Sequence, residues 1–108
     1  MLRIYHNPRC SRSRAALACL QEAGLNPEIV KYLDTPPRRE QLEVMIAKLD
    51  GPTSALLRDT PDSANMDDNA IIEAILASPK LLQRPVIEDE TRAIVGRPAQ
   101  RVEAFIAQ

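Results

Sequence analysis

No apolar run in the sequence approaches the roughly 20 residues that a membrane-spanning helix needs, so we expect no membrane association. The first residues also lack a basic stretch followed by an apolar region and a small-residue cleavage site, and we therefore expect a cytoplasmic protein. Internal repeats, low-complexity tracts and linkers are missing, and 108 residues suffice for one hydrophobic core. We expect a single domain over residues 1–108.

Histidine and cysteine are scarce: His6 is the only histidine, and Cys10 and Cys19 are the only cysteines. These residues lack the ligand spacing of a zinc site, so we expect no metal. Two cysteines do not make a disulfide scaffold, and a reducing compartment favours free thiols. The reactivity of each cysteine therefore has to be argued from its own surroundings.

Charge of one sign is also missing, because the formal net charge is −1 and the signs are interspersed. Such a chain has no global field for attracting nucleic acid, so we expect no nucleic-acid partner. Lysine is rare among the 14 basic residues, and the rest are arginines. The planar arginine fork suits two-point recognition of oxyanions, although genomic base composition alone produces the same bias.

Hydrophobic periodicity and turn residues predict strands and helices along the whole chain. The first half predicts a strand at residues 2–5, a helix capped by Ser11 or Ser13 and closed by Gly24, a strand at 28–33 and a helix at 38–49. The second half predicts a short helix at 53–58, a loop at 60–63, a helix capped by Asp67 or Asp68 that ends at Ser78 and Pro79, strands at 86–88 and 92–95, and a last helix from Pro98. This order predicts an α/β thioredoxin-like fold: a mixed four-stranded sheet with flanking helices and a helical insertion between its βαβ and ββα halves.

Cys10 lies where the first loop meets the first helix, so unpaired N–H groups and the helix dipole would stabilise its thiolate. Arg9, Arg12 and Arg14 add positive charge, and His6 lies just upstream. Thiol pKa values of ~3.5–7.5 are reached in such settings, so we predict that Cys10 is a nucleophile. The alternative is a buried or incidental cysteine, since cysteine is among the most buried residue types.

Cys19 lies in mid-helix among apolar neighbours, which favours packing over catalysis. Ser13 turns the motif into Cys-x-x-Ser and removes the nearest resolving thiol. The helix places Cys19 well beyond the Cα separation of roughly 4.4–6.8 Å that a disulfide allows. An external thiol should therefore resolve any adduct on Cys10.

Three arginines, Arg58, Arg84 and Arg97, stand at predicted junctions, where functional side chains tend to be presented. Each taken singly is better explained as a solvated surface residue, and convergence on Cys10 would change that. His6 is either a surface or structural residue or a residue that tunes the thiol by charge or by a hydrogen bond.

Five motifs in order along the chain resemble the glutaredoxin-linked arsenate reductase family. They are YHNPRCSRSR at residues 5–14, YLDTPP at 32–37, LLR at 56–58, PKLLQRPVI at 79–87 and VGRP at 95–98. The resemblance implies a thioredoxin fold and an enzyme whose Cys10 thiolate attacks arsenate. It also implies roles for the matching positions: oxyanion ligands at Arg58, Arg84 and Arg97, support of the thiolate by His6, Ser13 and Arg14, and a cis bond before Pro85.

The resemblance further implies glutathione as co-substrate, glutaredoxin as the partner that regenerates the enzyme, and no bound cofactor. We expect a monomer. Here only residues 59–70 join Arg58 to Ile71, a shorter stretch than in family members with established activity. A redox-responsive regulator of the same superfamily typically carries Cys-x-x-Cys, and Ser13 argues against that switch.

Two other functions stay open. One is a glutathione-dependent oxidoreductase acting on protein mixed disulfides, for which Cys-x-x-Ser is sufficient and the arginines would bind glutathione carboxylates. The other is a non-catalytic module of the same fold that senses redox state through Cys10 or binds a larger protein.

Overall fold

The computed structural model describes residues 1–107 and contains a four-stranded sheet in the order β2-β1-β3-β4. Strand β1 (Leu2–Tyr5) is parallel to β2 (Glu28–Val30) and antiparallel to β3 (Val86–Asp89). Strand β3 in turn pairs antiparallel with β4 (Ala93–Val95). The mixed sheet confirms the predicted architecture, because its βαβ half and its ββ half meet at β1 and β3.

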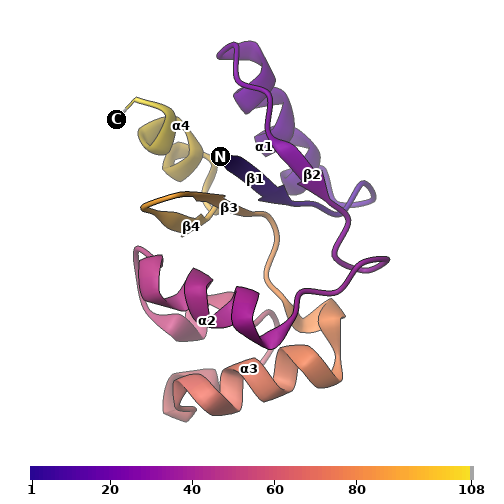
Figure 1. The fold of residues 1–108 in the computed structure, drawn as a ribbon, viewed down its shortest axis with the longest axis vertical. Coiled ribbons are helices and arrows are strands. Elements are labelled where there is room, and N and C mark those ends of the chain that lie inside the picture. Colours follow the sequence, from indigo (N-terminus) through magenta and orange to yellow (C-terminus); the bar gives the residue numbers. More distant parts are fainter. Residues whose placement is uncertain (108) are drawn as a thin grey trace.

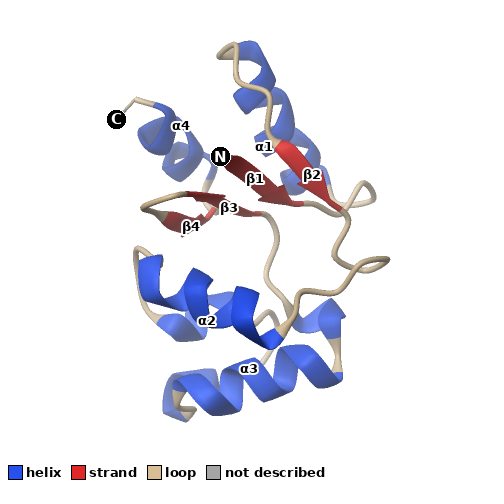
Figure 2. Cartoon of the chain, viewed as in Figure 1, coloured by secondary structure: helices blue, strands red, loops and turns tan. Residues whose placement is uncertain are grey.

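Helices cover both faces of this sheet (Figure 1, Figure 2). Helices α1 (Ser11–Glu22) and α4 (Ala99–Ile106) pack on one face. Helices α2 (Arg39–Lys48) and α3 (Asp68–Ala77) lie on the other. None of the helices described within residues 1–107 is long and apolar enough to cross a membrane.

Alternation along the strands divides the core into two layers, because successive side chains of a strand point to opposite faces. Ile4, Ile87 and Ile94 lie opposite one another across three strands and pack with α1 and α4. Their neighbours Tyr5 and Val86 join the layer formed by α2 and α3. The sheet is therefore held between helices, and the ends of β1 and β3 are left to carry the connecting loops.

Most predicted elements are found, with shifted boundaries. Gly24 has a positive φ of 82° just after α1, as expected of a residue that closes a helix, and Asp67 caps α3 by accepting a hydrogen bond from the N–H of Ala70 at 2.7 Å. The expected short helix at 53–58 is a 3-10 turn, Thr53–Leu56, and two more such turns occur at Ser63–Asn65 and Pro79–Leu81.

Two predictions about local structure are wrong. Neither Ser11 nor Ser13 caps α1: the cap position belongs to Cys10, and the buried Ser13 hydroxyl instead accepts a hydrogen bond from the N–H of Asn7 at 3.0 Å. Strand β2 also ends at Val30 rather than at residue 33, because the chain turns so that Tyr32 is buried in the core.

Candidate active site

Cys10 stands at the N-terminus of α1, in the extended conformation of a cap residue. Its own N–H donates to the carbonyl of Asn7 at 3.0 Å, and the Asn7 side chain accepts a hydrogen bond from the N–H of Arg9 at 3.0 Å. These bonds fix the loop after β1. The side chain is 9% exposed, so the sulfur is enclosed by the site rather than displayed on the surface.

The surroundings of Cys10 favour its thiolate. Burial raises the pKa of the thiol, but hydrogen bonds from the Ser13 backbone, the Arg84 side chain and the Arg12 backbone, with the charge of Arg84, lower it below its ordinary value of 9.0. Backbone N–H groups of the first helical turn thus act as the helix N-terminus was expected to act.

The origin of the positive charge differs from the sequence-based expectation. The guanidinium that lowers the pKa of Cys10 most is that of Arg84, which is distant in the sequence, whereas Arg12 lowers it through its backbone N–H. The Arg14 guanidinium donates to the carbonyl of Pro8 at 2.9 Å. The largest side-chain contribution to the lowered pKa of Cys10 thus comes from Arg84, which is distant in sequence.

Arg97 also reaches the sulfur: its Nη2 lies 3.7 Å from the Cys10 Sγ, within hydrogen-bond reach, and its Nε donates to the carbonyl of Arg84 at 2.6 Å. Gly96 allows this arrangement, because a Cβ there would lie 3.0 Å from the Pro85 Cγ. The Gly96 N–H donates to the Pro85 carbonyl at 2.8 Å. Close packing of these two connections thus brings Arg84 and Arg97 to one place.

The Arg84 guanidinium carries the most informative feature of the site. Its Nε and Nη1 are buried, and neither has a hydrogen-bond partner within the described part of the chain. Buried donors are nearly always paired, and an unpaired buried charge is costly. Two such nitrogens beside a thiolate form a site prepared for an anionic ligand.

Arg58 is brought into this region by a short antiparallel pairing with the segment before Arg84. Its N–H donates to the Leu81 carbonyl at 2.9 Å, and the Gln83 N–H donates to the Leu56 carbonyl at 2.7 Å. The Arg58 guanidinium, however, donates to the Asp59 carboxylate at 3.2 Å. Arg84 and Arg97 therefore interact with the sulfur, whereas Arg58 is paired with its neighbour in the sequence.

Tyr32 connects these groups and was missed in the sequence. Burial raises the pKa of its phenol, the charges of Arg84 and Arg58 and a hydrogen bond with the Asn7 side chain lower it, and Cys10 raises it. The pKa of the Tyr32 phenol is thus influenced by Cys10, by both arginines and by the loop after β1. Strand composition alone did not single out Tyr32, because an aromatic residue there is ordinary; the only signal was that Tyr32 opens the YLDTPP motif of the family resemblance.

His6 is hydrogen-bonded to Ser13, close to Cys10 in the sequence. Its Nδ1 and the Ser13 Oγ are hydrogen-bonded at 2.6 Å, and both side chains are buried. Burial, and then the charges of Lys31 and Arg14, lower the pKa of His6, so the imidazole is neutral at neutral pH. The neutral imidazole places no positive charge beside the thiol, and its hydrogen bond is to Ser13 rather than to Cys10.

Three further expectations concern Pro85, Cys19 and metals. The Arg84–Pro85 bond is cis, and so is Arg97–Pro98, which the sequence analysis did not predict. Cys19 is half-buried and lines a groove of about 420 Å³ between α1 and α4. Within residues 1–107 no group of three or more histidine, cysteine or acidic side chains is arranged to hold a metal ion.

Comparisons with known proteins show the family of the chain. The model of the ArsC family matches residues 5–105. The chain belongs to the ArsC family. An arsenate reductase of Neisseria meningitidis is 43% identical over 115 residues, which cover 97% of each chain. An arsenate reductase of Escherichia coli K12 is 33% identical over 107 residues, covering 92% of this chain and 76% of that protein.

Solved structures of ArsC relatives share the fold. The structure of an arsenate reductase from Vibrio cholerae superimposes with a TM-score of 0.82 at 33% identity, covering 95% of both chains. The predicted thioredoxin-like α/β fold is thereby confirmed for this ArsC-family chain. Cys10, Arg84 and Arg97 all lie within the matched region.

Proposed function

We propose that this chain is a thiol-dependent oxidoreductase that reduces arsenate to arsenite at Cys10, with glutathione and glutaredoxin as reductants. The observation that carries the proposal is the pair of buried, unpartnered Arg84 nitrogens beside the Cys10 sulfur. A tetrahedral oxyanion would supply the missing acceptors and stand next to the nucleophile. The names of the relatives, which are arsenate reductases, support this choice of oxyanion.

In the proposed reaction the Cys10 thiolate attacks arsenic(V) and forms a sulfur–arsenic bond as one oxygen leaves as water. The thiolate of glutathione displaces a second oxygen in the same way. A glutaredoxin thiolate then attacks the glutathione sulfur, forms a mixed disulfide and leaves the electron pair of the broken bond on arsenic, which becomes arsenic(III). Hydrolysis of the bond to Cys10 releases arsenite and restores the thiol.

Each residue of the site would have its own role in this reaction. Arg84 and Arg97 would hold oxyanion oxygens and stabilise the charge that builds up as sulfur attacks. The N–H groups of the first turn of α1 would donate to the thiolate and to the nearest oxygen. Arg58 would complete the set of ligands once an oxyanion is bound. Ser13 and His6 would hold the loop that positions Cys10.

The choice of an external thiol follows from the single cysteine at this site. Cys19 lines the groove between α1 and α4, and Ser13 occupies the position of a resolving cysteine. Glutathione would therefore act as a co-substrate, with no bound cofactor in the enzyme. We place the reaction in the cytoplasm, which keeps thiols reduced, and propose that the chain acts as a monomer.

A second candidate function is the reduction of protein–glutathione mixed disulfides. The Cys-x-x-Ser sequence at residues 10–13 favours it, because one low-pKa thiol is sufficient to attack such a disulfide. Arg84 and Arg97 would then bind glutathione carboxylates. The lowered pKa of Cys10 argues against the third alternative, a module in which this cysteine has no chemical role.

A coupled nicotinamide assay separates these functions. The protein is supplied with glutathione, glutaredoxin and glutathione reductase, and with either arsenate or a glutathionylated peptide as substrate. Arsenate-dependent oxidation of the nicotinamide should occur with the unaltered protein and with Cys19→Ser, and be lost in Cys10→Ser. Turnover of the peptide without turnover of arsenate would favour the second candidate, and turnover of neither would favour the non-catalytic module.

A further inference from the structure

Asp59 stands out in the backbone of the described chain. It is the only non-glycine residue of residues 1–107 with a positive φ, at 51°. The left-handed region is unfavourable for residues with a Cβ, and aspartate and asparagine tolerate it better than most. Such an exception at the rim of a functional site is a reason to ask what the side chain does.

The Asp59 side chain contacts its neighbour in sequence. The Arg58 Nη2 donates to the Asp59 Oδ2 at 3.2 Å, so the guanidinium already has an anionic partner within the same loop. Arg84 differs, because its Nε and Nη1 have no partner in the described residues. Arg84 is thus open to a ligand, and Arg58 is occupied by a carboxylate of the protein itself.

The ion pair between Arg58 and Asp59 is weak enough for an oxyanion to replace the carboxylate. The side chains of Arg58 and Asp59 are 33% and 81% exposed, and an ion pair in solvent contributes little to stability. A carboxylate and an oxyanion also present similar acceptors to a guanidinium. An oxyanion held by Arg84 can therefore displace the carboxylate of Asp59 at a small cost.

We propose that Asp59 competes with the oxyanion for Arg58 and so lowers the affinity of the site. The proposal rests on the proposed function, because it takes Arg58 to be an oxyanion ligand. It predicts that removing the charge of Asp59 tightens oxyanion binding. In turnover, the KM for arsenate should fall while kcat changes less, because the competition acts on binding.

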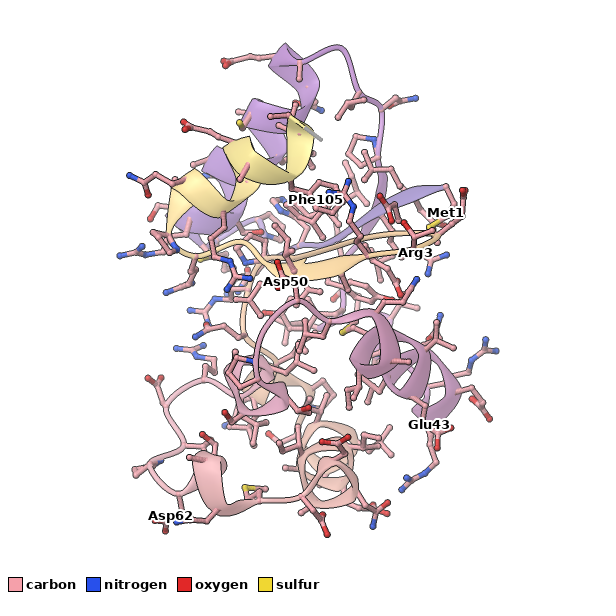
Figure 3. The ribbon with its side chains drawn as sticks, turned by 90° about the vertical axis from the view of Figure 1, so that its left-hand side faces the viewer. Met1, Arg3, Glu43, Asp50, Asp62 and Phe105 are labelled. Carbon is pink, nitrogen blue, oxygen red and sulfur yellow. The ribbon has the colours of Figure 1, made fainter. Side chains whose placement is uncertain are left out.

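Sulfate, a tetrahedral oxyanion that does not react with the thiol, tests this by isothermal titration calorimetry. Asp59→Asn keeps the shape and the tolerance of a positive φ, and its dissociation constant for sulfate should fall by about two- to fivefold, the range of an exposed ion pair. Asp62→Asn is the matched control. Asp62 lies in the same connection, at the bottom of the view in Figure 3, and takes part in no ion pair of the described residues.

A double-mutant cycle distinguishes the direct contact of Asp59 with Arg58 from a general effect of the negative charge of Asp59 on anion binding. In an Arg58→Ala background, adding Asp59→Asn should give no gain in sulfate affinity. The proposal is overturned if Asp59→Asn gives no gain, if Asp62→Asn gives an equal gain, or if the gain persists without Arg58. If the unaltered protein binds sulfate and Asp59→Asn binds it equally well, this inference alone is wrong. An absence of binding in both defeats it together with the oxyanion site of the proposed function.

Discussion

The Nδ1 of His6 lies 2.6 Å from the Oγ of Ser13, and this buried pair ties the end of β1 to the first turn of α1. The same hydroxyl accepts the N–H of Asn7, whose carbonyl in turn accepts the N–H of Cys10. One serine therefore fixes the loop that presents the nucleophile. The serine of the Cys-x-x-Ser motif therefore has a structural role in this chain, besides leaving the motif with one thiol.

Ser13→Ala should destabilise the protein by about 1–3 kcal/mol, because the His6 ring and the Asn7 N–H would lose a buried partner. Urea unfolding measures the change. Ser11→Ala removes a hydroxyl from an exposed residue of the same turn and should change stability by no more than about 0.5 kcal/mol. Equal midpoints for the two variants would show that the Ser13 hydroxyl does not hold the loop.

Brief treatment with iodoacetamide near neutral pH should label Cys10 far faster than Cys19, as mapped by mass spectrometry. The Ser13 and Arg12 N–H groups and Arg84 lower the pKa of Cys10 despite its burial, and the thiolate is the reactive form. Removing the guanidinium in Arg84→Ala should move the pH midpoint of Cys10 labelling upward. Faster labelling of Cys19 would mean that Cys10 is not the nucleophile.

Stability should depend on pH through Cys10. Its pKa in the folded protein lies below the ordinary 9.0, so between the two values the unfolded chain binds more protons than the folded one. The free energy of unfolding of the unaltered protein, relative to that of Cys10→Ser, should therefore rise with pH through this window. The gain is complete above 9.0 and is lost as the pH falls through the folded pKa. A pH-independent difference would contradict the lowered pKa.

Arg84→Ala should reduce kcat/KM for arsenate by an amount equivalent to ~2–4 kcal/mol, the loss seen when one preorganised donor is removed. Arg84→Lys should recover only part of this, since lysine keeps the charge and loses the fork. Arg9→Ala is the control: Arg9 is exposed and close to Cys10 in sequence, and its loss should change little. Similar losses of kcat/KM in Arg9→Ala and Arg84→Ala would show that Arg84 contributes no more to catalysis than an arginine next to Cys10 in the sequence.

Much of the fold follows from local patterns, whereas the site depends on contacts that no local pattern encodes. The alternation at residues 2–5 and the turn at Asp89 are local, so β1 and the β3–β4 hairpin were predicted closely. The nearness of Arg58 to the Arg84 segment arises from the pairing of Leu57 with Leu82. The sequence predicts a short helix at 53–58 and no strand next to Leu82, so this pairing could not be foreseen.

The positions of Ser13 and Tyr32 could not be predicted from the sequence for a different reason. Ser13 has the composition of a helix cap, but burial gives its hydroxyl two other partners, and Cys10 takes the cap position. Tyr32 belongs by composition to a strand, but the chain turns before it and buries it near Arg84. In both cases tertiary packing overrides local preference.

The central claim is that Cys10 and Arg84 form one oxyanion site, and protection of Cys10 from alkylation tests it most directly. The rate of Cys10 labelling by iodoacetamide is measured as arsenate or sulfate is added, in the unaltered protein and in Arg84→Ala. The account predicts a saturable slowing in the unaltered protein that is weakened strongly in the variant, because the anion covers the sulfur. A labelling rate that neither anion changes would contradict it.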